Sequence, residues 1–572
     1  FSKLDLEEYL PELERLILLS KERIESIKAV ESPIFENIIN KLESISYEMD
    51  LLAGIFFNLN SAETSDRMQE IARDFMSKLT VFSNDLNLDA GLFSKVNTVY
   101  EKRESLDLDE ESFRLLEKHY DDFSRNGALL KSGDKEKLRK LDEELSQKSL
   151  LFGENLLSET KAFELFLSEE EVKGLPEGIK DSFKEAAAEK GKEGFYLVNL
   201  DYPSFVPFMQ YAENRELREK LYRARMSLCF NDSETSNIEN IKSLVKLRDQ
   251  RAKLLGFKDH VEFTLKKRMA ESEDRVNEFL KELKDKSLPR AKEELQEVND
   301  FANKHGHKGE IQRWDYSFWS EKLKKEKLSL DTELLRPYFK LENVIDGAFS
   351  VANKLYGLSF KEDSNIDVYH DDVTAYRVSD EDGEDVGLFY ADFFPRKGKR
   401  GGAWMTIFKD QFIESGEDHR PHISIVCNFT KPSKLRPSLL NFDEVLTLFH
   451  EFGHALHGLL TKCQYKSLSG TNVFWDFVEL PSQVLENWCY EKECLSLFAR
   501  HYETGELIPD EFIEKIQGLR TFGEGLATLR QLSFATVDMK WHSKEGGAVE
   551  NFPNFEKTVV GELDIFPPVE GT

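Results

Sequence analysis

The most informative stretch of this sequence is Asn441-Phe442-Asp443-Glu444-Val445-Leu446-Thr447-Leu448-Phe449-His450-Glu451-Phe452-Gly453-His454-Ala455-Leu456-His457. It contains the pattern H-E-x-x-H at positions 450–454. On an α-helix, residues four apart differ by about 40° in azimuth and by one turn in height, so His450 and His454 present their imidazoles to one point. Two convergent imidazoles suit a tetrahedral Zn²⁺ ion. Glu451 lies beside that face, where a carboxylate can polarise a water molecule at the metal without being a ligand.

The residues around this pattern predict a buried helix. Asn441 is a good N-cap, and Glu444, three residues later, completes a capping box. Apolar residues surround the two histidines: Val445, Leu446, Phe449, Phe452, Leu456 and Leu459. Because buried histidines and a buried glutamate without partners cost free energy, the sequence predicts one zinc ion per chain. The alternative is an accidental motif in a helical scaffold, which predicts a protein without bound metal.

A catalytic zinc takes three protein ligands and keeps one position open. Position 460, where one class of zinc peptidases has a third histidine, is Leu460. His457 lies one turn beyond His454, but three successive ligands on one straight helix cannot all reach one metal. We therefore interpret His457 as a residue that orients a ligand or faces the substrate. A purely structural histidine is an equal alternative.

Acidic candidates for the third ligand lie in the segment Trp475–Trp488. Pro481 is tolerated in a first helical turn, so we expect a helix to start a few residues before it. Glu479, Gln483 and Glu486 then share one face of that helix. Spacing alone favours Glu479 only weakly over Glu486 as the ligand. Either can instead be the acceptor that orients a ligand imidazole.

Upstream of the histidine helix, the sequence predicts a small antiparallel β-sheet. Aromatic and β-branched residues alternate with turn residues in Ile366–Tyr376, Val386–Phe393, Gly401–Phe408 and Ile423–Phe429. We expect one of the last two segments to be an edge strand that pairs with an extended peptide. Gly401 and Gly402, followed by Ala403, permit close backbone approach, and we predict that these three residues bind substrate. An ordinary turn explains the two glycines equally well.

The rest of the chain has a helical pattern. Apolar residues recur three and four apart in stretches such as Leu10–Ile27, Phe113–Lys148, Glu213–Leu255 and Ser272–Asn303. We therefore expect a mainly α protein. It divides into an N-terminal helical region at 1–156, a mixed and mostly helical region at 157–364, and a catalytic region at 365–572.

The composition argues against some partners. Of the 572 residues, 78 are Lys or Arg and 107 are Asp or Glu, and the net charge of −29 repels nucleic acid and anionic membranes. No apolar run approaches the roughly eighteen residues of a membrane span. The five cysteines form no C-x-x-C pair and favour a reducing compartment, so we expect the cytoplasm, with the periplasm as the alternative. The basic run at 396–400 is interpreted as a solvated turn.

Several segments together resemble the thimet-oligopeptidase family of zinc metallopeptidases. The family pattern H-E-F-G-H-x-x-H is present at 450–457, and Gly470-Thr471 is followed by D-F-V-E-x-P-S-Q at 476–483. The stretch Phe498–Gly505 is most similar to the bacterial dipeptidyl carboxypeptidase (peptidyl-dipeptidase) branch. Further similar segments are Arg268-Met269-Ala270, Trp314-Asp315, Gly401–Met405 and Cys427–Pro432.

The resemblance implies that His450, His454 and Glu479 are the zinc ligands and that Glu451 is the general base and then the acid. It also implies two helical lobes that flank a deep channel, which admits short peptides and excludes folded proteins. The branch implies release of dipeptides from peptide C-termini. An endo-acting oligopeptidase of the same family and a non-catalytic zinc-binding interaction protein are the alternatives. Members of the family continue into a segment with a histidine and several tyrosines that contact the substrate, and we expect this segment to be missing after Thr572.

Overall fold

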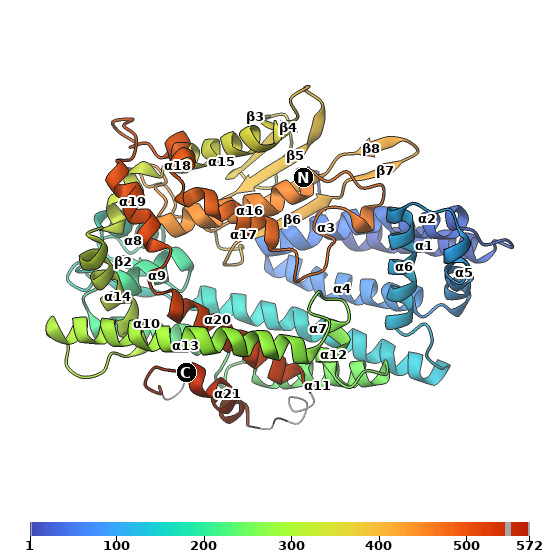
Figure 1. The fold of residues 1–572 in the computed structure, drawn as a ribbon, viewed down its shortest axis with the longest axis horizontal. Coiled ribbons are helices and arrows are strands. Elements are labelled where there is room, and N and C mark those ends of the chain that lie inside the picture. Colours follow the sequence, from blue (N-terminus) through green and yellow to red (C-terminus); the bar gives the residue numbers. More distant parts are fainter. Residues whose placement is uncertain (2, 544–548, 550, 570–572) are drawn as a thin grey trace.

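The structure is a computed structural model that describes residues 1, 3–543, 549 and 551–569. It is mainly helical, with small β-sheets (Figure 1), which confirms the predicted fold class. Within the described ranges, no helix is long and apolar enough to cross a membrane. The division into three regions, and the two lobes around a channel, stay predictions.

The first part of the chain is built only from helices. The stretch Phe113–Lys148, which has one continuous helical pattern, contains two helices because the chain turns at Gly127, whose φ is 98°. Glycine adopts such a φ without the steric cost of a Cβ atom. The helices are α1 (Tyr9–Lys28), α2 (Phe35–Glu43), α3 (Tyr47–Ala62), α4 (Asp66–Asn87), α5 (Ala90–Tyr100), α6 (Glu110–Arg125) and α7 (Ser132–Ala162).

The middle of the chain adds further helices and a two-stranded sheet of β1 (Leu165–Leu167) and β2 (Tyr196–Val198). The amphipathic stretch Ser272–Asn303 is the long helix α13, and the Ser272 hydroxyl caps it by accepting the Arg275 N–H at 3.3 Å. The helices are α8 (Glu177–Glu189), α9 (Tyr202–Tyr211), α10 (Arg215–Met226), α11 (Ile238–Leu254), α12 (His260–Leu265), α13 (Glu273–Lys304), α14 (Arg313–Leu328) and α15 (Leu341–Tyr356).

The predicted sheet is present, but it is mixed rather than antiparallel. Its strand order is β3-β4-β5-β9-β6, and β5 pairs with β9 in parallel. The chain inserts β6 and the hairpin β7–β8 between them, so it re-enters the sheet beside β5 in the same direction. The bounds are β3 (Ser359–Glu362), β4 (Val373–Ser379), β5 (Asp385–Asp392), β6 (Trp404–Lys409), β7 (Phe412–Glu414), β8 (Glu417–His419) and β9 (His422–Val426).

This strand order decides between the two candidates for an edge strand. β6 lies at the edge of the sheet, whereas β9 is hydrogen-bonded on both sides, to β5 and to β6. The prediction that Ile423–Phe429 is a candidate edge strand for peptide binding was therefore wrong. Part of β6 is approached by α3, because a Cβ atom on Gly54 would lie 3.5 Å from the Ile407 carbonyl oxygen.

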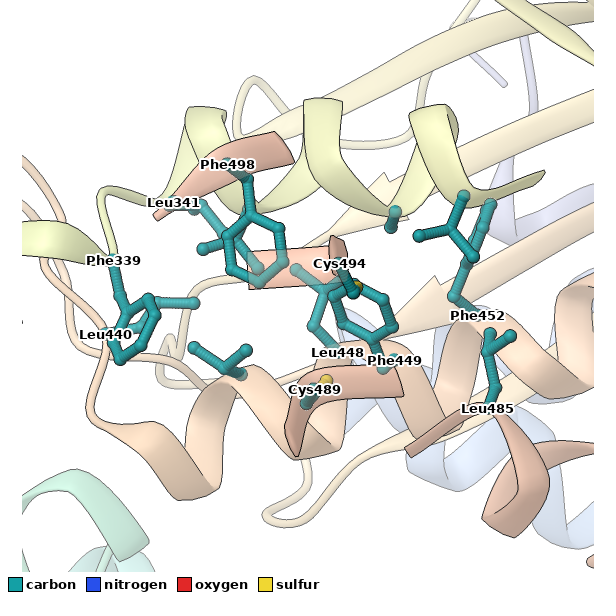
Figure 2. Packing of buried hydrophobic residues seen from close by; sticks show 14 of the residues in the cluster. Phe339, Leu341, Leu440, Leu448, Phe449, Phe452, Leu485, Cys489, Cys494 and Phe498 are labelled. Carbon is teal, nitrogen blue, oxygen red and sulfur yellow. The ribbon is translucent and has the colours of Figure 1, made fainter. Parts of the chain in front are cut away.

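The histidine helix is α16 (Phe442–Leu459), and it is buried as predicted. In Figure 1 it lies with α17 (Leu480–Glu486) between the sheet and the long helices α7, α13 and α20 (Glu524–His542). Figure 2 shows Phe449 of α16 and Phe498 of α18 (Lys492–Phe498) beneath α15, and their ring centroids are 5.7 Å apart. Phe452, farther along α16, lies against Phe389 of β5 with ring centroids 5.8 Å apart. This apolar packing holds α16 in place from two sides.

The basic run at 396–400 is not a solvated turn. Lys399 is fully buried, and its Nζ lies 2.7 Å from the Asp392 carboxylate, while Arg396 donates two hydrogen bonds of 2.8 Å to the same carboxylate. Only Lys397 and Arg400 of the run are exposed cations. Asp392 is a buried carboxylate at the end of β5, and burial of an unpaired charge costs free energy. Arg396 and Lys399 of the run compensate this charge inside the protein.

The C-terminal part is again helical, with α19 (Asp510–Leu519) before α20 and α21 (Phe552–Val560) after it. Asn551 caps α21, because its side chain accepts the Asn554 N–H at 3.1 Å. Residues 570–572 lie outside the described residues.

Candidate metal centre

Helix α16 presents His450 and His454 on one face. The capping box is present as predicted: the Asn441 side chain accepts the Glu444 N–H at 2.7 Å, and the Glu444 carboxylate accepts the Asn441 N–H at 2.8 Å. The two imidazole centroids are 5.0 Å apart. One turn of helix therefore brings both rings to a common point, as the four-residue spacing predicts.

Glu479 comes to this point from the next helix. It precedes Leu480, the first residue of α17, and its Oε2 lies 3.2 Å from His450 Nε2 and 3.1 Å from His454 Nε2. Ligand atoms of the three residues all lie within 4.8 Å of one another. Ser482 fixes the Glu479 carboxylate, because its hydroxyl donates to Oε2 at 2.9 Å.

Gly453 makes this approach of the two helices possible. A Cβ atom at this position would lie 2.6 Å from the Ser482 Cα atom and 2.9 Å from the Pro481 carbonyl oxygen. Contacts this short are not sustainable, so only glycine lets α17 start so close to the histidines. No role was predicted for this glycine from the sequence, although its place between the two histidines was a signal.

Glu486 contacts the other side of His450. It lies about two helical turns beyond Glu479 along the chain, and its Oε1 is 2.7 Å from His450 Nδ1. The structure therefore separates the two acidic candidates: Glu479 faces the Nε2 atoms, and Glu486 faces the remaining ring nitrogen. A carboxylate in the second position fixes the orientation and the tautomer of a ligand imidazole.

Glu451 is the buried acid beside this cluster. Its Oε2 has no hydrogen-bond partner among the described residues. Burial, which the Glu479 charge reinforces and His450 opposes, raises the pKa of Glu451 to about 7. Burial also lowers the pKa of His454, which favours the neutral imidazole that binds a metal.

The donor set fits zinc. Two imidazole nitrogens and one carboxylate oxygen are a common three-ligand set of catalytic zinc sites, and the outer carboxylate on His450 completes the usual support of such a ligand. Buried carboxylate oxygens normally have a hydrogen-bond partner. The unpartnered Oε2 of Glu451 therefore indicates that a polar group binds next to the three donors.

The remaining predicted residues lie outside the ligand set. His457 is half-buried, and its Nδ1 has no hydrogen-bond partner within the described part of the chain. Gly401 and Gly402 are exposed and Ala403 is half-buried, just before β6. Gly402 has a φ of 92°, so the turn itself requires glycine. Their contact with a substrate stays a prediction.

A large cavity adjoins the loop that leads from α16 to Glu479. Its volume is about 1250 Å³, and its walls come from α6, residues 267–269 and the loop between α16 and α17. Phe477 and Val478, directly before Glu479, belong to this wall. The family resemblance implies a deep channel, but the residues that line this cavity were not predicted, because its three wall segments lie far apart in the chain.

Metal-dependent peptidases have this arrangement of side chains. Two histidines four residues apart lie on one helix, a glutamate comes from the next helix, and a buried carboxyl group without a partner lies beside them. The sequence as a whole agrees with this class. The model of peptidase family M3 matches residues 208–562, and the chain belongs to this family. It is therefore a peptidase.

Individual relatives share most of the chain. The dipeptidyl carboxypeptidase of Escherichia coli (strain K12) is 36% identical over 543 residues, which cover 94% of this chain and 79% of that protein. Oligopeptidase A of the same organism is 33% identical over 555 residues, covering 95% of this chain and 81% of that protein. A crystal structure assigned as an oligoendopeptidase F has a similar fold, with a TM-score of 0.56, 15% identity, and coverage of 96% of this chain and 78% of that one.

Proposed function

We propose that this protein is a zinc metallopeptidase that hydrolyses short peptides and releases dipeptides from their C-termini. One observation carries the proposal: His450 Nε2, His454 Nε2 and Glu479 Oε2 converge on one point, beside the unpartnered carboxyl of Glu451. We further propose that the protein works in the cytoplasm, with the periplasm as the alternative.

Each residue around the proposed metal centre has a different role in peptide hydrolysis. A bound zinc ion supplies Lewis acidity, which lowers the pKa of water toward about 7 and polarises a peptide carbonyl group. Glu451 orients the attacking water through its free Oε2, accepts a proton from it, and delivers that proton to the leaving amine nitrogen. Glu486 holds the His450 ring through Nδ1.

The edge strand β6 is the proposed binding surface for the peptide backbone. Its outer side is not paired with another strand among the described residues, and Gly401 and Gly402 leave the space before it open, since a Cβ atom at either would meet no atom within 4 Å. The side chain of Asn428 supports this turn by donating to the carbonyl oxygens of Arg400 at 3.0 Å and Gly402 at 2.7 Å. An extended peptide can add to such an edge by main-chain hydrogen bonds.

The mode of cleavage is the finer part of the proposal. The similarity of Phe498–Gly505 to the dipeptidyl carboxypeptidase branch supports removal of dipeptides. An endo-acting oligopeptidase is the second candidate, because the likeness to oligopeptidase A is nearly as strong.

Mass spectrometry of the products decides between the two. An N-terminally acetylated peptide of about ten residues is incubated with the zinc-loaded protein, and products are followed with time. We expect dipeptides to leave successively from the C-terminus, and we expect amidation of that C-terminus to slow them. Early internal cuts would establish the endo-acting alternative. No products from a protein that holds zinc would establish a non-catalytic zinc protein.

A further inference from the structure

We infer that Asp476 is a positioning residue, which ties the turn Arg268–Ala270 to the loop that carries Glu479 and thereby fixes the third metal ligand. The inference rests on the proposed zinc site. It assigns a role to the Arg268-Met269-Ala270 segment, to which the proposed chemistry gives none.

The contact between the two segments is specific. Asp476 accepts the Met269 N–H through Oδ1 at 2.9 Å and the Ala270 N–H through Oδ2 at 3.0 Å. Both oxygens of one carboxylate thus bind two consecutive backbone donors in the connection between α12 and α13. Hydrogen bonds to an ionised acceptor are about twice as strong as neutral ones.

A second contact lies next to the first. The guanidinium carbon of Arg268 lies 5.5 Å from the centroid of the Trp475 ring, within the range of a cation–π interaction. Two consecutive residues of the ligand loop, Trp475 and Asp476, therefore hold two neighbouring parts of the same turn. These segments are more than 200 residues apart in the chain.

The chain between Asp476 and Glu479 can transmit this anchoring. The Phe477 N–H donates to the Phe474 carbonyl at 2.9 Å, and the Leu480 N–H donates to the Phe477 carbonyl at 2.9 Å. The Glu479 carbonyl then accepts the Gln483 N–H at 3.0 Å, inside α17. A continuous series of hydrogen-bonded turns thus joins the anchor to the metal ligand.

Hydrophobic burial holds this loop only in part. Trp475 is 73% exposed and Val473 is 36% exposed, and the 1250 Å³ cavity borders the loop on one face. The Glu479 side chain is itself half-exposed. Since Phe474, Phe477 and Val478 are only half-buried, apolar packing holds the loop in part, and polar contacts such as those of Asp476 add the order that a metal ligand needs.

The test measures zinc affinity of the full chain by competition with a chromogenic chelator. Asp476→Ala removes both hydrogen bonds, and we expect zinc to bind about 10–100-fold more weakly, the usual range for losing an outer support of a metal ligand. Asp476→Asn keeps one acceptor oxygen, so we expect an intermediate loss. Asp371→Ala, at an exposed aspartate of the sheet region, is the control and should bind zinc as the unmodified protein does.

The outcomes separate this inference from the proposed function. If the unmodified chain binds no zinc, the proposed function fails. If it binds zinc and Asp476→Ala binds zinc equally well, only the inference fails. Circular dichroism of the metal-free proteins checks folding. If Asp476→Ala does not fold, the Asp476→Asn result decides, and an unchanged affinity there overturns the inference.

Discussion

Three glutamates near the metal centre have three different environments. Glu479 faces the Nε2 atoms of both histidines, Glu486 faces His450 Nδ1, and one oxygen of Glu451 has no partner within the described residues. The same carboxyl group is thus placed to be a ligand, a support for a ligand and a general base. Position, rather than residue type, separates the three roles.

The role of Glu451 predicts that Glu451→Gln separates metal binding from turnover. The amide keeps the size of the side chain but cannot accept the proton, so we expect kcat to fall by about 10²–10⁴-fold. Zinc content should be unchanged, because Glu451 is not among the three converging donors. Stopped assays on a short peptide, with metal analysis of the same sample, check this. A variant with full zinc and full activity would contradict the role.

The contact at His450 Nδ1 predicts that Glu486→Gln weakens metal binding. We expect a loss of about 10–100-fold in zinc affinity, because the ring is no longer held by a charged acceptor. Glu493→Gln, at an exposed glutamate of α18, is the matched control. Isothermal titration with zinc measures both. Equal affinities for the two variants would show that Glu486 is not a support.

Some features of the site could be predicted from the sequence, and others could not. The capping box and the pair His450 and His454 followed from spacing within one helix, because α-helical geometry is local. Spacing did not distinguish Glu479 from Glu486, because the distinction depends on how α17 packs on α16; only the family resemblance favoured Glu479. The same reason explains Gly453, whose role appears only when the second helix is in place.

At the scale of elements, the centre depends on the close packing of α16 and α17. The sheet supports α16 from the other side, with Ile423 of β9 against Gly458 near the end of the helix. The sequence predicted four of the strands but not their pairing. The parallel pairing of β5 with β9 was not predicted. The alternation of apolar and polar residues identifies a strand but does not show which strands pair with one another.

Gly453→Ala tests the packing of the two helices. The added methyl group would overlap the backbone at Ser482, so we expect a destabilisation of about 1–3 kcal/mol together with weaker zinc binding as Glu479 is displaced. Gly153→Ala is the control: it lies inside α7 with no atom near the new methyl group, and it should stabilise the protein by about 0.5–1 kcal/mol. Chemical denaturation measures both. Equal stability changes at the two glycines would contradict the packing argument.

At the scale of the whole molecule, the loop at 396–400 joins the N-terminal helices to the sheet. The Thr64 N–H donates to the Gly398 carbonyl and the Arg400 N–H donates to the Ser61 carbonyl, both at 2.8 Å, at the end of α3. The buried carboxylate of Asp392 holds this loop through Arg396 and Lys399. This role was not predicted from the sequence, because a basic run is usually solvated.

Asp392→Asn should destabilise the protein by about 3–5 kcal/mol at neutral pH, because it leaves the buried Lys399 without its carboxylate partner and leaves Arg396 paired with Glu63 alone. Burial disfavours the charged Asp392 carboxylate, but Arg396 and Lys399 outweigh this and hold its pKa below its usual range. The folded protein therefore releases this proton more readily than the unfolded chain does. The stability from this group is present above about pH 4 and is lost as the pH falls through the lowered pKa.

Denaturant titrations at several pH values check this expectation. The difference in unfolding free energy between the unmodified protein and Asp392→Asn should shrink below about pH 4. Asp371→Asn, at an exposed aspartate, should show almost no difference at any pH. A constant difference for Asp392→Asn down to about pH 2 would contradict the pairing.

Metal analysis of the purified chain tests the claim that His450, His454 and Glu479 together hold one zinc ion. Zinc is quantified in the unmodified protein and in His454→Ala and Glu479→Ala after dialysis against metal-free buffer. We predict one zinc per chain in the unmodified protein and nearly none in either variant. An unmodified chain without zinc, or variants that keep a full zinc complement, would contradict the claim.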